Sequence, residues 1–174
     1  MYVVGHRGAA GVQPENTLPG FEYALSLGCE YVETDVHLSK DGHSVIIHDD
    51  TVNRTTNGQG RVADLTLAEL RALDAGQGRQ IPLLQEVLDM VRGKAILLCE
   101  LKGVWTPDPV VRAVLANKMS DQVIFTSFHF GRLARVKQID ARLRIGAIFG
   151  DPPPDALEEA VALGADRVDI QHTK

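Results

Sequence analysis

The sequence predicts an α/β protein built on a mostly parallel sheet, and three observations support this class. Short apolar runs alternate with stretches in which apolar residues recur at helical spacing, as in strand–helix–strand units. Residues 95–102 (AILLCELK) are apolar almost throughout, as in a strand that is buried on both faces. Charged residues gather where several of these runs end. The chain therefore reads as one repeated strand–helix pattern.

The pattern predicts six strands with five intervening helices and one inserted region. The expected strands are residues 3–5, a strand that begins at Tyr31, and residues 95–102, 122–127, 143–149 and 167–171. The first helix follows Asn16 or Thr17, either of which can cap it, and ends at Gly28. Later helices are expected from Asp108, over residues 130–138, and from Asp155 to Gly164.

The region after the second strand departs from this pattern. Residues 40–42 (KDG) predict a tight turn, because glycine accepts positive φ angles, and the turn folds residues 44–48 back as a hairpin partner. Residues 50–93 then behave as an insertion with short helices of its own. We expect a single domain over residues 1–174, in which residues 50–93 form a lid or flank.

Composition narrows the class of protein. A chain of 174 residues that is 44% hydrophobic and 24% charged has room for one domain with a substantial core. Its net charge of -5 argues against a nucleic-acid partner, and its one basic stretch, residues 132–144, is typical of a solvated helix face. No apolar run approaches the roughly eighteen residues that span a bilayer, and no leader precedes the first strand. We therefore expect a cytoplasmic protein with no membrane span.

Two acidic residues are the first candidates for a functional site. Glu33 and Asp35 are two positions apart in an expected strand, so their carboxylates share one face of the sheet. Two adjacent like charges raise each other's pKa, and a hard divalent cation with oxygen ligands would relieve their repulsion. Such a pair alone is more often a solvated strand edge. Here the hairpin also returns His48 toward the pair.

Seven titratable residues are expected at one edge of the sheet. Most lie at the carboxyl end of a predicted strand, and the hairpin brings the remaining one there. They are His6, Arg7, Glu33, Asp35, His48, Glu100 and Lys102. In parallel α/β barrels catalysis takes place at this edge. Each residue alone has an ordinary interpretation, such as a simple Glu100–Lys102 ion pair, but their convergence favours a functional site.

A series of short motifs is spread along the chain. They are HRG at residues 6–8, PENT at 14–17, ExDVHLxKDG at 33–42, HD at 48–49, NRTTNG at 53–58, IPxLxEVL at 81–88 and ELK at 100–102. In this order and at these spacings, the sequence resembles the glycerophosphodiester phosphodiesterase family over nearly its whole length.

The resemblance implies a fold, a reaction and a set of residue roles. The fold would be a TIM-type (β/α) barrel, of whose eight strands this chain supplies about six. The reaction would be hydrolysis of a glycerophosphodiester to glycerol 3-phosphate and an alcohol with a divalent cation, Mg²⁺ or Ca²⁺. The implied roles are metal ligation by Glu33, Asp35 and Glu100, acid/base catalysis by His6 and His48, and phosphate binding by Arg7 and Lys102.

Other residues have weaker assignments. Glu15 and Asn16 are expected to orient Arg7 or to line the pocket, although a helix cap explains Asn16 equally well. Phe128, with Trp105, is expected to form an apolar wall for the substrate's alcohol group. His37 follows the acidic pair on the same strand face, and His172 ends the last strand. Each of these residues also has a purely structural interpretation.

The short strand count leaves alternatives open. The chain is either a fragment of a longer protein or a form whose open barrel is closed by a partner segment or a second copy of itself. A non-catalytic remnant that binds a metal or phosphate is one rival function. A phosphodiester lyase on the same barrel, which would stop at a cyclic phosphate, is another, although the ELK and NRTTNG motifs argue against it.

Overall fold

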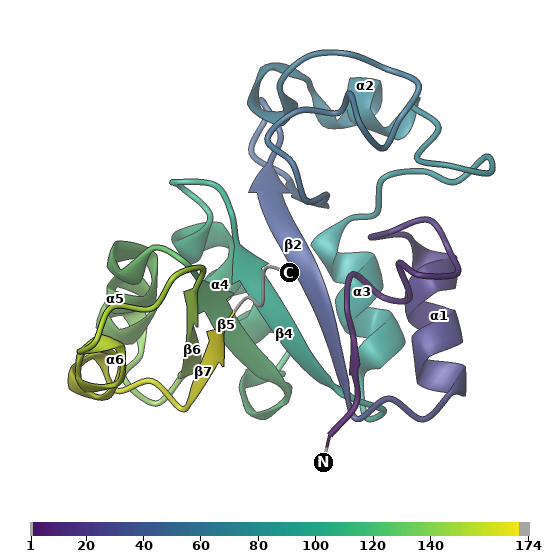
Figure 1. Cartoon of the computed structure of the whole chain (residues 1–174). Helices are drawn as coiled ribbons and strands as arrows, with labels where there is room; N and C mark the ends of the chain where they lie inside the picture. The colour runs from purple at the N-terminus through teal and green to yellow at the C-terminus, as the bar shows by residue number, and fades with distance from the viewer. Residues whose placement is uncertain (1, 171–174) are drawn as a thin grey trace.

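The computed structural model describes residues 2–170 as an α/β fold with a curled, mostly parallel sheet (Figure 1). The parallel strands, in spatial order, are β1 (Val4–Gly5), β2 (Tyr31–Leu38), β4 (Ile96–Leu101), β5 (Val123–Ser127), β6 (Arg144–Phe149) and β7 (Arg167–Ile170). β3 (Ser44–Ile46) pairs antiparallel with β2, as the predicted hairpin requires. The predicted α/β class and the six parallel strands are confirmed.

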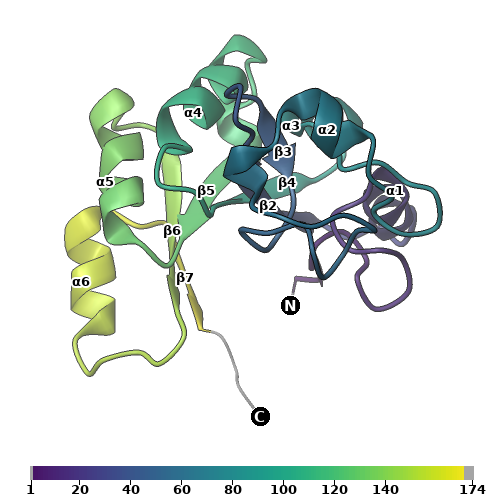
Figure 2. The ribbon, with the colours of Figure 1, turned by 90° about the horizontal axis from the view of Figure 1, so that it is seen from above.

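Helices cover the outer side of this arc, as the view along the strands shows (Figure 2). They are α1 (Leu18–Ser26), α3 (Leu84–Val91), α4 (Pro107–Ala116), α5 (Phe130–Ile139) and α6 (Ala156–Leu163). Neighbouring helices contact one another in chain order. Their apolar faces and the outer face of the sheet form the main core, which contains Phe21, Leu97 and Leu133 with no exposed surface. The arrangement is a half-barrel with its helices outside.

A second, smaller core lies beyond the carboxyl end of β2 (Figure 1). We call residues 44–83 the cap; they include β3, a short 3-10 helix (Val62–Asp64) and α2 (Leu67–Arg71). The cap buries its own apolar residues, which are Val45, Ile47, Val52, Val62, Leu70, Ala75 and Ile81.

Helix α3 does not belong to the cap, although the sequence placed it within the insertion. Its buried residues Leu84, Val87, Leu88 and Val91 pack into the main core beside α1. It thus supplies the helix between β2 and β4 that a parallel crossover needs. The region outside the barrel pattern is therefore shorter than the expected 50–93.

The two outer strands of the described sheet, β1 and β7, each pair on one side only. Val4, Val168 and Ile170 on these strands are partly or largely exposed. The concave inner face therefore opens between the two edges. Within residues 2–170, none of the helices has the length and apolar character needed to cross a membrane.

Candidate active site

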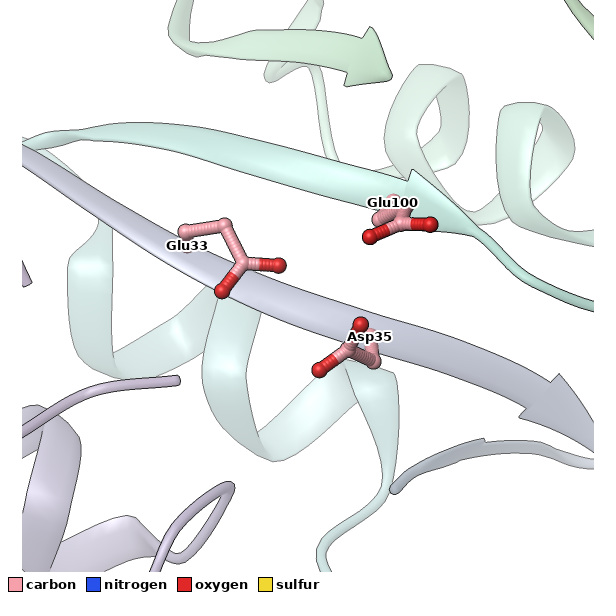
Figure 3. A group of neighbouring side chains, drawn as sticks. All are labelled: Glu33, Asp35 and Glu100. Carbon is pink, nitrogen blue, oxygen red and sulfur yellow. The ribbon is translucent and has the colours of Figure 1, made fainter. Parts of the chain in front are cut away.

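Three carboxylates meet on the inner face of the sheet (Figure 3). Glu33 and Asp35 alternate along β2, and the parallel register sets Asp35 beside Glu100 on β4. One oxygen from each side chain lies within 4.8 Å of the others. Asp35 is 1% exposed and Glu100 is 7% exposed. Strand alternation and register together therefore hold three acidic groups in one largely buried cluster.

The cluster is electrostatically unfavourable without a cation. Burial raises the pKa of Glu33 well above its ordinary value, and the neighbouring Asp35 carboxylate raises it further. Burial likewise raises the pKa of Glu100 to about 7, although Lys102 opposes the shift. Asp35 Oδ1 is buried and has no hydrogen-bond partner. This unsatisfied oxygen, in a set of oxygen donors only, fits a hard divalent cation. The residues present form an acidic cluster that could bind a metal ion.

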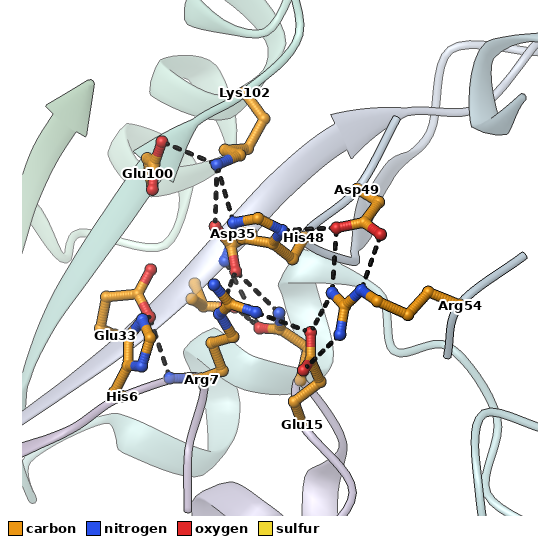
Figure 4. A network of polar contacts seen from close by, with 12 residues as sticks. His6, Arg7, Glu15, Glu33, Asp35, His48, Asp49, Arg54, Glu100 and Lys102 are labelled. Carbon is orange, nitrogen blue, oxygen red and sulfur yellow. Dashed lines mark hydrogen bonds and ion pairs between the residues drawn. The ribbon is translucent and has the colours of Figure 1, made fainter. Parts of the chain in front are cut away.

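Lys102 contacts three other members of the polar network (Figure 4). Its Nζ atom is 3.1 Å from Glu100 Oε1 and 3.6 Å from Asp35 Oδ1. The same atom lies 3.2 Å from His48 Nε2 and 5.8 Å from the centre of the Phe128 ring. One ammonium group thus connects the acidic cluster to a histidine and to an aromatic wall.

Arg7 is held against the cluster by a tight loop after β1. Its backbone has a φ of 50°, and its backbone N–H donates to Glu33 Oε2 at 2.9 Å. Its Nη1 donates to Glu15 Oε1 at 3.0 Å. The next residue is Gly8, with a φ of 80°, where an added Cβ would come within 2.7 Å of the Gly20 backbone. Only glycine fits at position 8, so Gly8 of the HRG motif is needed for the loop that places the arginine.

Asn16 holds Asp35 in place. Its Nδ2 donates to Asp35 Oδ2 at 2.8 Å, and its Oδ1 accepts from the Thr34 hydroxyl. Its backbone N–H donates to the Arg7 carbonyl at 2.9 Å. The side chain is buried and the φ is 54°, a conformation that asparagine tolerates better than most residues. From the sequence, a helix cap and a place beside Arg7 or the pocket were equally good interpretations of Asn16; the structure gives it a contact with the acidic cluster.

The two histidines approach from different sides. His6 follows β1, and its Nε2 lies 3.8 Å from Glu33 Oε2; burial, and then the Arg7 charge, lower its pKa. His48 follows β3, and its Nδ1 lies 2.6 Å from Asp49 Oδ1. Hydrogen bonds from Arg54, and then from His48, hold the pKa of Asp49 well below its usual range. Because an ionised carboxylate only accepts, His48 donates from Nδ1 and turns Nε2 toward Lys102.

A cavity of about 570 Å³ opens above these groups. Its lining includes most of the predicted site residues, namely His6, Arg7, Glu33, His48, Glu100, Lys102 and Phe128. Asp35 contacts this set from below, through Lys102. Glu15 does not line the cavity but lies behind Arg7. The inner face also contributes Thr126, Arg167 and Asp169, which the sequence did not single out.

A second hollow, of about 820 Å³, lies beside the first and shares only Phe128 with it. Trp105, which is 80% exposed, lines this second hollow and not the first. His37 is buried and contacts the His48 carbonyl through Nε2 at 3.2 Å, so it supports the loop that carries His48. His172 lies outside the described residues.

Asp49 and Arg54 were missed as site residues. Both occur in motifs that the sequence displays, HD and NRTTNG; Asp49 directly follows the predicted hairpin strand, whereas Arg54 lies within the expected insertion. Their position depends on how the cap folds over the barrel. The motifs and their spacing were the only sequence signal for these two residues. The pattern of strands and helices could not predict where in the fold they lie.

The fold and the site define an α/β-barrel protein with an acidic, histidine-containing pocket at the carboxyl edge of its sheet. The sequence matches the glycerophosphoryl diester phosphodiesterase family over residues 6–174, and the chain belongs to that family. A glycerophosphodiester phosphodiesterase from Caldanaerobacter subterraneus is 40% identical over 160 residues, which cover 84% of this chain and 66% of that protein. One from Bacillus altitudinis is 36% identical, with coverages of 86% and 66%.

A solved structure shows the same fold. The phosphodiesterase from Oleispira antarctica, in complex with the product sn-glycerol-3-phosphate, superposes with a TM-score of 0.87 at 32% identity. The match covers 98% of this chain and 74% of that one. The chain thus spans just under two thirds of the two relatives named above and about three quarters of this solved structure.

Proposed function

We propose that this chain hydrolyses glycerophosphodiesters to glycerol 3-phosphate and an alcohol. The observation that supports this most strongly is the cavity itself. In a member of this family, Glu33 and Glu100 line one 570 Å³ space together with two histidines, an arginine and a lysine from separate segments. Asp35 completes the acidic cluster beside this space. The bound product of the Oleispira antarctica phosphodiesterase is consistent with the same substrate class.

In this proposal Glu33, Asp35 and Glu100 hold the divalent cation, Mg²⁺ or Ca²⁺. Their spacing supports this assignment, as does Asp35 Oδ1, which has no hydrogen-bond partner. When bound, the cation supplies Lewis-acid chemistry and a template for phosphate oxygens. Asn16 fixes the orientation of Asp35 through its 2.8 Å hydrogen bond.

His6 and His48 carry the protons. Cleavage of a phosphodiester removes a proton from the attacking oxygen and delivers one to the leaving alkoxide, and imidazole is suited to both steps near neutral pH. The two rings line the same cavity and come from different segments, His6 from the loop after β1 and His48 from the cap. Asp49 holds His48 with its Nε2 directed toward the other site residues.

Arg7 and Lys102 bind the phosphate. The Arg7 guanidinium can donate two parallel hydrogen bonds to phosphate oxygens, and Lys102 contributes a point charge. Both line the cavity, so both can oppose the negative charge that grows in the transition state. Glu15, which pairs with Arg7, orients the guanidinium and does not contact substrate in this proposal.

The test is a coupled glycerol 3-phosphate assay on the 174-residue chain, with glycerophosphocholine and glycerophosphoethanolamine as substrates. We expect activity that a chelator abolishes and that added Mg²⁺ or Ca²⁺ restores. Asp35→Asn should stay inactive after metal addition, whereas Asp50→Asn, an exposed aspartate in the cap, should behave as wild type.

Other products would point to other functions. Accumulation of a cyclic phosphate without glycerol 3-phosphate would show a lyase. Binding of metal and glycerol 3-phosphate without turnover would show a non-catalytic form. Turnover that is unaffected by the chelator and by Asp35→Asn would contradict the proposed metal centre.

A further inference from the structure

Arg54, in the cap, forms two bidentate ion pairs along two adjacent edges of its guanidinium, which share Nη2 (Figure 4). Toward Asp49, its Nε donates at 2.8 Å and its Nη2 at 2.9 Å. Toward Glu15, its Nη1 donates at 2.9 Å and its Nη2 at 2.8 Å. Asp49 and Arg54 come from the cap, whereas Glu15 comes from the loop after β1. One side chain therefore joins two segments that are 39 residues apart.

Each of the two carboxylates that Arg54 binds also accepts a hydrogen bond from a residue of the pocket. Glu15 Oε1 accepts from Arg7 Nη1 at 3.0 Å, and Asp49 Oδ1 accepts from His48 Nδ1 at 2.6 Å. Arg54 is not among the residues that line the cavity, so it can act there only through its partners. The described contacts form a continuous row from the proposed phosphate-binding arginine to the proposed catalytic histidine.

We propose that Arg54 is a positioning residue that sets Arg7 and His48 relative to each other. The inference rests on the proposed function, because it assumes that these two residues act on one substrate. Its geometry suits the task, since only a guanidinium offers enough N–H groups in one plane to hold two carboxylates bidentately. Glu15 then holds Arg7, and Asp49 holds His48, through the hydrogen bonds given above.

The charges of Glu15, Arg54 and Asp49 favour a fixed arrangement of these three side chains. The hydrogen bonds from Arg54 are the main cause that lowers the pKa of Glu15, and they lower that of Asp49 as well. The side chains of Glu15 and Asp49 are 17% and 28% exposed, so both pairs are shielded more than a free surface pair. Single exposed ion pairs contribute little to stability, but a bidentate network of three groups restricts geometry. The expected role is therefore alignment and not stabilisation of the fold.

The experiment compares Arg54→Gln and Arg54→Lys with Arg61→Gln in the 174-residue chain. Arg61 is the matched control, because it is also an arginine of the cap and pairs with an aspartate, Asp50, but contacts no pocket residue through it. We expect Arg54→Gln to lower kcat/KM by roughly 10- to 100-fold, the size of effect that a small misplacement of reacting groups produces. Arg54→Lys should recover only part of this loss, because a lysine pairs as a point charge.

Three further readouts separate positioning from structure. Ring ¹⁵N shifts of His48 should change in Arg54→Gln but not in Arg61→Gln, because Asp49 is released only in the former. Affinity for glycerol 3-phosphate should fall several-fold in Arg54→Gln through the freed Arg7. In Arg54→Ala, added guanidinium ion at low millimolar concentration should restore part of the activity, since the 47% exposed side chain leaves a site open to solvent. Thermal unfolding should be nearly the same for all variants.

The outcomes distinguish this inference from the proposed function. A wild-type chain without turnover would contradict the function, yet the His48 spectrum and the product affinity would still test the role of Arg54. If Arg54→Gln matches Arg61→Gln in these two readouts, the positioning role is wrong. It is also wrong if the lost activity follows a lowered unfolding temperature while the His48 spectrum of the folded protein is unchanged.

Discussion

The barrel and the cap contribute to the site by different means. The acidic cluster comes from the barrel, where strand alternation places Glu33 with Asp35 and the β2–β4 register adds Glu100. The cap contributes His48, Asp49 and Arg54 from loops around its own small core. Metal binding should thus depend on the main sheet alone. Turnover should depend on the sheet and on the position of the cap.

Removal of His48 gives the strongest test of this division. Because the imidazole carries a proton in the proposed mechanism, His48→Ala should reduce kcat by roughly a hundredfold or more. Its affinity for Mg²⁺ or Ca²⁺, measured by calorimetry, should be nearly unchanged, since all proposed ligands lie in the barrel. His43→Ala, an exposed histidine of the same hairpin, is the control and should keep full activity. A full rate in His48→Ala would refute its assigned role.

The same division decides what could be predicted from sequence. The acidic cluster was predictable, because residues two apart on a strand share a face and parallel strands end at one edge. His48 was predictable only because a KDG turn sets a short hairpin. The contacts of Asn16 and Arg54 were not, because they depend on a left-handed backbone at residue 16 and on how the cap lies against the barrel. Local periodicity contains no information about either.

A substitution in the cap core should also lower turnover without weakening metal binding, but by a smaller factor than His48→Ala. Leu70→Ala removes a fully buried side chain from the cap, at a cost of about 2–5 kcal/mol in local stability. Because the cap has its own core, we expect it to loosen and kcat to fall several-fold, while cation affinity is retained. Hydrogen exchange should show faster exchange in residues 44–83 than in β2 and β4.

Leu133→Ala is the matched control for this experiment. Leu133 is equally buried but lies on α5 in the main core. We expect it to lower the unfolding temperature of the whole chain without a selective effect on the cap. If both variants accelerate exchange uniformly, the cap and the barrel are one cooperative unit, and the comparison drawn above fails.

The pH dependence of the free energy of unfolding tests the acidic cluster formed by Glu33, Asp35 and Glu100. A carboxyl with a pKa of about 7 in the folded chain and an ordinary value in the unfolded chain binds more protons when folded. Its contribution therefore weakens stability as pH rises from about 4.5 to about 7. The raised pKa of Glu33 acts in the same sense, and the lowered pKa values of His6 and His37 act in the opposite sense. The prediction is therefore made for the difference between wild type and Glu100→Gln, which reports on Glu100 and on its repulsion of Glu33.

We expect Glu100→Gln to be more stable than wild type at pH 8 in the presence of a chelator, by on the order of 1–3 kcal/mol. At pH 5 the two should be nearly equal. Added Ca²⁺ or Mg²⁺ should stabilise wild type and not the variant. Urea unfolding at both pH values provides the measurement. Equal stability at pH 8 would show that the buried carboxyl is not strained without a cation.

Substitution of Phe128 should have the smallest effect on activity, because its side chain has no group that can transfer a proton or bind a metal or phosphate. Its ring is 40% exposed, lines both hollows and lies 5.8 Å from Lys102 Nζ. As an apolar wall for the alcohol group, it should contribute to binding equally in the ground state and the transition state. Phe128→Ala should thus raise KM a few-fold at unchanged kcat.

The size of that increase should depend on the alcohol, which gives the prediction its control. Glycerophosphocholine, with a larger and less hydrated head group than glycerophosphoethanolamine, should lose more affinity when the aromatic face is removed. Trp105→Ala should change neither KM, because Trp105 lines only the second hollow. An equal loss for both substrates would mean that Phe128 acts through Lys102 and the phosphate. The alcohol would then lie against the open inner face near Thr126 and Arg167.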